Sequence, residues 1–225
     1  MTITTVLTDI EGTTTDIRFV HNVLFPYARE HLADYLTAQW GNPEVVAVVK
    51  QVRNELADQA ANKDVITSTL LDWIDQDKKI TPLKTLQGLM WSDGYANGDF
   101  TGHLYQDAYE YLTSWHAKGL SLNVFSSGSV NAQKLLFKYS DFGDLTALFD
   151  GYYDTNYGHK REPEAYQAIA KAIGVPPEQV LFLSDIQEEL DAAKVAGIQT
   201  CLLERDDKIP DPRHHVVHTF DQIEL

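Results

Sequence analysis

The stretch TITTVLTDIEGTT, residues 2–14, joins a short run of strand-forming residues to two acids and a glycine. Residues 2–8 are rich in Thr, Ile, Val and Leu, which favour β-structure. Asp9 and Glu11 follow two residues apart, so both carboxylates can point into one site at the end of this strand. Gly12 permits a tight turn out of the strand. Taken alone, the stretch is equally consistent with solvated acids at a strand end.

Beyond this strand, the sequence consists of a helical middle and a later region in which strands and helices alternate. Apolar residues recur at helical spacing over residues 23–40, 44–61, 65–77 and 82–95. We then expect strands at 120–125, 149–153, 180–184, 199–203 and 216–220, with helices at 105–118, 130–139, 163–173 and 187–196. Such alternation is typical of right-handed βαβ units. The predicted fold class is therefore α/β, a Rossmann-like parallel sheet core with helices on both faces.

The order of these regions predicts a split core domain with an insertion. We expect residues 1–15 and 101–225 to form the α/β core and residues 16–100 to form an all-helical cap after strand one. In open parallel sheets, ligands bind outside the carboxyl ends of the strands. An insertion that begins at such an end is therefore expected to act as a lid.

Two segments that follow predicted strands carry groups suited to a phosphate. Ser126 and Ser127 lie between a strand and a helix, where hydroxyls and free backbone N–H groups bind phosphate oxygens. The ordinary alternative is an N-cap provided by Ser127 or Ser129. Lys160 precedes a helix whose first turn is marked by Pro163. Its ammonium suits a phosphoryl group, although a lone lysine is usually solvated.

Asp185 follows another predicted strand and is a suitable oxygen ligand for a hard cation. The alternative is a second N-cap, with Glu188 and Glu189 in a first turn where the helix dipole favours acids. Because the carboxyl ends of parallel strands share one edge of the sheet, these segments and Asp9 are expected to converge.

The composition indicates which partners and which cellular compartment to expect. The chain has 225 residues with a formal net charge of -15, and such an acidic surface disfavours nucleic acid and anionic membranes as partners. We expect no targeting segment and no membrane span. Cys201 is the only cysteine and is predicted to be a buried strand residue, which fits a reducing, cytoplasmic location. No pattern indicates an oligomer interface, so we expect a monomer.

Three histidines near the end, His214, His215 and His218, raise the question of a metal cluster. They surround a short predicted strand and are distant in sequence from the four motifs. We expect a solvated or edge-strand role for them rather than zinc binding.

Together the four motifs resemble the haloacid dehalogenase superfamily of phosphotransferases, which carries them in this order with a cap after the first. The first motif, Asp9-Ile10-Glu11-Gly12-Thr13-Thr14, has Glu where D-x-D-G-T members have Asp. It resembles the acireductone-forming enolase-phosphatase branch of methionine salvage. Further similarity to that branch runs through residues 83–88, Trp91, Gly94-Tyr95, Gly98, 102–105, 126–130, 132–137 and 158–160.

The resemblance implies a Mg²⁺-dependent hydrolase that forms an aspartyl-phosphate on Asp9. The implied ligands of one Mg²⁺ per chain are Asp9, Asp185 and the main-chain oxygen of Glu11. The Glu11 side chain would act as general acid and base. Ser126 and the amide of Ser127 would hold phosphate.

A charge count supports the implied metal. Lys160, which would orient Asp9, offsets one of the charges that Asp9, Asp185 and a phosphate dianion bring together. A divalent cation would neutralise most of the remainder.

The implied substrate is 2,3-diketo-5-methylthiopentyl-1-phosphate, a small phosphorylated diketone that is enolised and then dephosphorylated to acireductone. The enolisation base could be Glu11 or a cap residue. Phe19, Val20 and Trp91 could contact the methylthio tail, although core packing is the commoner role of such residues.

The sequence leaves three alternatives open. A general phosphomonoesterase of the same superfamily would share Asp9, Lys160 and Asp185 but would perform no enolisation. A haloacid dehalogenase would use an aspartate nucleophile without a metal, although Glu11 and the Thr13 hydroxyl favour phosphoryl chemistry. A non-catalytic interaction module on an enzyme fold would tolerate loss of Asp9.

Overall fold

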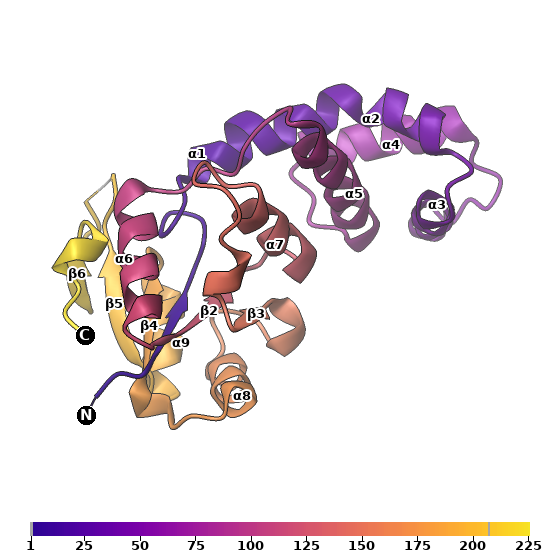
Figure 1. Cartoon of the computed structure of the whole chain (residues 1–225). Helices are drawn as coiled ribbons and strands as arrows, with labels where there is room; N and C mark the ends of the chain where they lie inside the picture. The colour runs from indigo at the N-terminus through magenta and orange to yellow at the C-terminus, as the bar shows by residue number, and fades with distance from the viewer. Residues whose placement is uncertain (1, 207) are drawn as a thin grey trace. The chain divides into compact units, whose positions relative to one another are not determined.

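The computed structural model describes residues 2–206 and 208–225, and the chain divides into two compact units (Figure 1). One unit comprises Met1–Ile17 and Thr101–Leu225, and the other comprises Arg18–Phe100. The first contains the sheet and the second is helical. The sequence predicts an insertion over residues 16–100, and its role as a lid stays a prediction.

A parallel sheet of six strands, in the order β3-β2-β1-β4-β5-β6, forms the centre of the first unit over its described residues. The chain extends from β1 toward β3, then returns to the other side of β1 and extends through β4 to β6. Strand order therefore reverses between β1 and β4, the position at which open sheets bind ligands. The strands are β1 (Thr5–Thr8), β2 (Ser121–Phe125), β3 (Gly151–Tyr153), β4 (Val180–Ser184), β5 (Gln199–Leu203) and β6 (His215–Val217).

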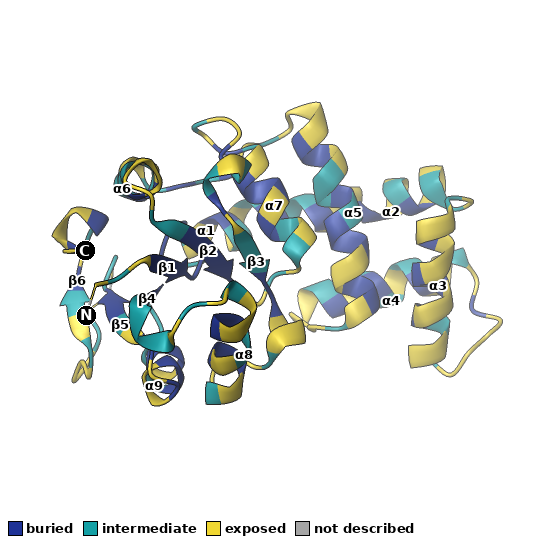
Figure 2. Cartoon of the chain, turned by 60° about the horizontal axis from the view of Figure 1, so that its bottom comes forward, coloured by how far each residue is buried: buried dark blue, intermediate teal, exposed yellow. Residues whose placement is uncertain are grey.

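Helices cover both faces of this sheet, which confirms the predicted fold class. Figure 2 shows α6 on one side of the sheet and α8 and α9 on the other. β1 and β4 are buried along their whole length, because strands covered on two faces need apolar residues on both. The helices of this unit are α6 (Gln106–Ala117), α7 (Val130–Lys138), α8 (Pro163–Ile173) and α9 (Gln187–Val195).

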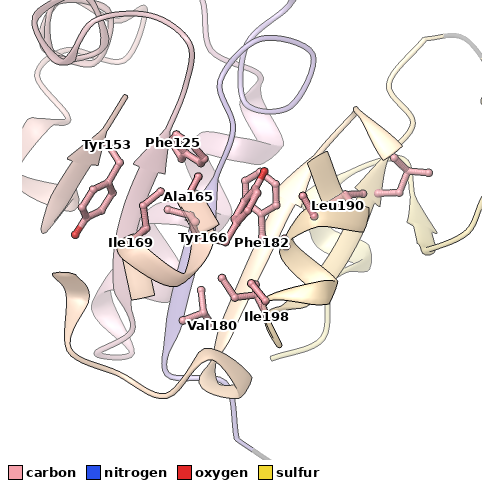
Figure 3. Close-up of a cluster of buried hydrophobic side chains, with 14 residues drawn as sticks. Phe125, Tyr153, Ala165, Tyr166, Ile169, Val180, Phe182, Leu190 and Ile198 are labelled. Carbon is pink, nitrogen blue, oxygen red and sulfur yellow. The ribbon is translucent and has the colours of Figure 1, made fainter. Parts of the chain in front are cut away.

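The core beneath α8 and α9 fixes the strand ends that carry the polar motifs (Figure 3). The Tyr166 ring of α8 lies 5.5 Å from that of Phe125 on β2 and 5.1 Å from that of Phe182 on β4, between ring centroids. Burying a side chain of this size stabilises the fold by about 1.5–3 kcal/mol. Helix α8 is therefore held firmly against strands on both sides of β1.

The helical unit has its own core, formed by apolar residues of four α-helices. Two of these helices begin at asparagine N-caps, since Asn42 accepts from the N–H of Glu44 at 2.9 Å and Asn62 from that of Val65 at 3.0 Å. Within this unit Phe19 and Trp91 pack against aromatic side chains of the same unit. The elements are α1 (Ile17–Phe19), a π-helix (Val20–Leu24), α2 (Phe25–Gln39), α3 (Pro43–Glu55), α4 (Lys63–Asp75) and α5 (Thr81–Asn97).

Two predicted elements end three or more residues earlier than expected. The helix predicted to run to residue 61 ends at Glu55, because Ala57 adopts a left-handed φ of 52°. The strand predicted over 216–220 ends at Val217, and Phe220 begins a 3₁₀ turn and stacks on Trp115 with ring centroids 5.5 Å apart. No helix of the described residues has the length and apolarity that a membrane span needs.

Candidate active site

The Asp9 carboxylate lies at the carboxyl end of β1, the strand beside the reversal of strand order. Its backbone N–H donates to the carbonyl of Leu183 on β4 at 2.9 Å, which fixes the backbone one residue past the strand. Its Oδ1 accepts a hydrogen bond from Lys160 Nζ at 2.6 Å. Both residues are buried, with 3% of Asp9 and 5% of Lys160 exposed. The structure thus brings the predicted nucleophile and its predicted cation into direct contact.

Lys160 is presented by the loop between β3 and α8. Gly158 has a φ of 129°, and a Cβ at this position would lie 2.9 Å from the Cβ of Ala165, so the close approach of loop and helix requires glycine. The Lys160 carbonyl accepts from the hydroxyl of Tyr166 at 2.7 Å. Lys160 Nζ also lies 5.7 Å from the ring centroid of Phe125. The ammonium is therefore positioned from several directions.

A second carboxylate, that of Glu189 on α9, also holds this ammonium. Glu189 Oε2 lies 2.7 Å from Lys160 Nζ and accepts from the Ser184 hydroxyl at 3.1 Å. Burial would lower the pKa of Lys160, but the charges of Asp9 and Glu189 outweigh it and raise that pKa above its ordinary value. Burial, followed by the Asp9 charge, raises the pKa of Glu189 to about 7. The two carboxylates therefore stabilise the charged form of Lys160.

Sequence reasoning places Glu189 only in a helical first turn and misses this ion pair. A signal was available in the spacing of α9. Residues 189, 193 and 196 lie on one face, and the last two are buried alanines. A helix positions such residues one above another, so the acid belongs to the face that packs on the sheet.

Asp185 follows β4 and packs against the turn that leaves β1. A Cβ on Gly12 would overlap Asp185 Oδ2 and would lie 2.5 Å from its Cγ. Asp185 Oδ1 is buried and has no hydrogen-bond partner among the described residues. Burial, followed by the negative charge of Asp9, raises the pKa of Asp185 to about 7. The first and fourth motifs therefore meet through the glycine of the first.

Glu11 reaches the second motif from the same turn. Its Oε2 accepts from the Ser126 hydroxyl at 3.1 Å. Burial raises the pKa of Glu11, and the neighbouring Asp9 charge raises it further. Both effects favour the protonated form of Glu11, the form in which a general acid acts.

The second motif forms a turn between β2 and α7. The Ser126 N–H donates to the carbonyl of Tyr153 at 3.2 Å, and the Gly128 N–H donates to Ser126 Oγ at 3.0 Å. Ser127 lies between them. The capping role belongs to Ser129, whose hydroxyl accepts from the N–H of Ala132 at 3.3 Å. The cap and the groups predicted to bind phosphate are thus different residues of one turn.

The site has more carboxylates than cationic groups, and this excess of acidic groups fits a divalent cation. Four carboxylates, those of Asp9, Glu11, Asp185 and Glu189, gather near the ammonium of Lys160. Carboxylate oxygens are the ligands that Mg²⁺ prefers, and the orphaned, buried Asp185 Oδ1 needs a partner. The residues present therefore fit a small, hard cation.

No group of three or more His, Cys, Asp or Glu side chains within residues 2–206 and 208–225 has the spacing of a metal site. Among the terminal histidines, His215 lies in the edge strand β6. His214 lies directly before this strand, but it is not solvated, since its side chain is 1% exposed and contacts Asp191 at 3.0 Å.

Comparisons with known proteins extend over both units of the chain. The model of the haloacid dehalogenase-like hydrolase family matches residues 3–197. A Citrobacter koseri protein named Enolase-phosphatase E1 is 56% identical over 218 residues, covering 97% of this chain and 95% of that protein. A protein of the same name from Pectobacterium atrosepticum is 54% identical over 220 residues, covering 98% and 96%. The solved structure of the Saccharomyces cerevisiae UTR4 protein gives a TM-score of 0.84 at 35% identity, covering 98% of this chain and 100% of that chain.

Proposed function

This chain belongs to the haloacid dehalogenase-like hydrolase family, and we propose that it is an enolase-phosphatase of methionine salvage. In this proposal it enolises 2,3-diketo-5-methylthiopentyl-1-phosphate and then removes the phosphate, which yields acireductone and inorganic phosphate. The observation that carries the proposal is the buried contact of 2.6 Å between Asp9 and Lys160 at the end of β1. The full-length similarity to proteins named Enolase-phosphatase E1 supports the choice of substrate.

Asp9 is the proposed nucleophile. Lys160 holds Oδ1, so the attack on phosphorus falls to Oδ2. The bond between phosphorus and the ester oxygen breaks, and an aspartyl-phosphate forms. Dividing one difficult displacement into two easier ones is the general advantage of covalent catalysis.

Glu11 is the proposed proton donor and acceptor. Because its pKa is raised, its protonated carboxyl can give a proton to the departing ester oxygen. The resulting carboxylate then takes a proton from water, whose oxygen attacks phosphorus and releases Asp9. The hydrogen bond from Ser126 fixes the direction in which Glu11 points.

Ser126 and Ser127 are proposed to bind the phosphate through hydroxyl and amide groups in the turn before α7. Lys160 orients Asp9 and neutralises charge on the phosphoryl group. One Mg²⁺ per chain, held by Asp9, Asp185 and the main-chain oxygen of Glu11, would stabilise the charge that develops on the phosphoryl and enolate oxygens.

We place the enzyme in the cytoplasm as a monomer that binds neither nucleic acid nor membranes. The buried free thiol of Cys201 suits a reducing compartment. The net charge of -15 opposes binding to phosphate backbones and anionic lipids.

A phosphate-release assay on the diketone phosphate, with and without Mg²⁺, tests the proposal. We expect phosphate and the ultraviolet absorbance of an enediol product to rise together, and only with the metal. Asp9→Asn should abolish both signals while the protein stays folded by circular dichroism. Phosphate release without the enediol signal would instead indicate a general phosphomonoesterase of the same family.

A further inference from the structure

The turn that carries Glu11 and Gly12 is held from outside by an arginine far away in the sequence. Within the turn, the N–H groups of Thr13, Thr14 and Thr15 all point to the carbonyl of Ile10, at 2.9 to 3.2 Å. The Thr15 carbonyl accepts from the N–H of Gly12 within the turn, whereas the Thr13 carbonyl is bonded from a distant segment. Arg205, just past the end of β5, donates to the Thr13 carbonyl from Nε at 3.0 Å and from Nη2 at 2.8 Å.

Arg205 is itself fixed on every side. Its Nη1 donates to Asp107 Oδ2 at 2.7 Å, and this oxygen also accepts from the N–H of Phe220 at 2.8 Å. The guanidinium carbon lies 4.3 Å from the ring centroid of Tyr105 and 5.1 Å from that of Phe220. Its side chain is 8% exposed. A planar fork between two rings can hold one carbonyl with two donors, which an ammonium cannot reproduce.

Arg205 also contacts Tyr105, which lies in the segment where the chain returns from the helical unit to the sheet unit. Tyr105 donates its N–H to the Thr14 carbonyl at 2.9 Å, next to the carbonyl that Arg205 holds. Two consecutive carbonyls of the turn are thus fixed by residues that also contact each other. The turn cannot shift without breaking both.

We propose that Arg205 is a positioning residue of the reaction. It fixes the Thr13 carbonyl and thereby the two preceding residues, Glu11 and Gly12. Glu11 is the proposed acid, and Asp185 packs against Gly12. This inference rests on the proposed roles of Glu11 and Asp185. Displacing such groups by about 1 Å can reduce turnover about 100-fold.

Arg205→Lys and Arg205→Ala test this role, with Arg213→Ala, at a half-exposed arginine, as the control. Arg213 also pairs with a carboxylate, that of Asp191 at 2.6 Å, and its backbone N–H donates to Gln187, so these contacts lie outside the turn. We expect kcat to fall about 100-fold in Arg205→Ala and about 10-fold in Arg205→Lys, with little change in KM. Arg213→Ala should keep the kcat of the wild type.

Chemical rescue separates positioning from a purely structural role. Guanidinium ion at a non-denaturing concentration should restore part of kcat in Arg205→Ala and leave the wild type and Arg213→Ala unaffected. A folded Arg205→Ala enzyme with unchanged kcat, or one that guanidinium does not rescue, would overturn the proposal. Should Arg205→Ala fail to fold, Arg205→Lys decides alone, and unchanged kcat in that variant refutes the role.

Assays of the wild-type enzyme distinguish failure of this inference from failure of the proposed function. If wild-type enzyme gives no enediol signal but hydrolyses a simple phosphomonoester, the proposed substrate is wrong while the Arg205 comparison proceeds on that ester. If wild type performs both steps and the Arg205 variants match it, only the positioning role is lost.

Discussion

Replacing Gly12 by alanine isolates the contact between the first and fourth motifs. Gly12 has a φ of 76°, in the left-handed region, and its missing Cβ leaves room for the Asp185 carboxyl. The substitution therefore introduces two separate penalties. One is backbone strain, which affects folding, and the other is an overlap with a side chain proposed to bind the metal.

The backbone strain lowers stability, whereas the overlap with Asp185 lowers activity. An alanine in the left-handed region costs about 1–2 kcal/mol, which lowers the melting temperature of a chain of this size by about 2–8 °C. The new Cβ would lie 2.5 Å from Asp185 Cγ, whereas carbon atoms in contact are about 3.5–4.0 Å apart. Asp185 must therefore move by about 1 Å, and a shift of that size can cost about 100-fold in turnover.

Gly98→Ala is the matched control because Gly98 has the same φ of 76°, and a Cβ added there would meet no heavy atom within 4 Å. Melting temperature followed by circular dichroism, together with Mg²⁺-dependent phosphate release, would compare the two variants. We expect similar melting temperatures, with activity lost only in Gly12→Ala. Equal activity in the two folded variants would show that the packing of Asp185 on Gly12 does not matter to the reaction.

Three further outcomes are expected. Glu189→Gln removes a charged hydrogen bond to Lys160, and phosphate release should fall at least about 10-fold; unchanged kinetics would contradict a role for this pair. Because Asp185 and Glu189 have pKa values of about 7, above their ordinary values of 3.8 and 4.5, the metal-free fold binds protons more tightly than the unfolded chain and loses stability as pH rises through that window. Mg²⁺ should therefore raise the melting temperature more at about pH 8 than at about pH 5, and an equal shift would count against the site. Burial raises the pKa of Cys201 to about 12, so mass spectrometry should find it unmodified by iodoacetamide in the native protein at about pH 8, whereas rapid labelling would refute its burial.

Much of the site could be predicted from the sequence because its groups follow strand ends. Asp9, Ser126, Lys160 and Asp185 each come after a strand of one parallel sheet. Parallel strands end at the same edge, so strand assignment alone indicates that such groups converge. The order of the strands was not predictable in this way. That β1 lies between β2 and β4 depends on which helices cover each face, which no single segment determines.

Contacts between side chains of segments far apart in the sequence could not be predicted. Arg205 follows β5 as one of many charged residues, and nothing in its neighbours indicates a contact with Thr13, 192 positions earlier. Likewise, the buried state of His214 depends on Asp191 and Thr200, which reach it only after α9 packs beside β5. Long-range hydrogen bonds of this kind follow from packing and leave no periodic signal in the chain.

The acidic cluster at the carboxyl ends of β1 and β4 is costly to the fold. Burial is the largest cause of the raised pKa values of Glu11, Asp185 and Glu189 alike, so the fold itself disfavours their charged forms. A core chosen for stability alone would replace such groups with apolar ones. Natural sequences depart from local stability rules mainly at functional sites. The same burial that destabilises these carboxylates strengthens their attraction for a cation and favours the protonated form of Glu11, which its proposed role as an acid requires. The instability and the proposed chemistry therefore have one physical origin.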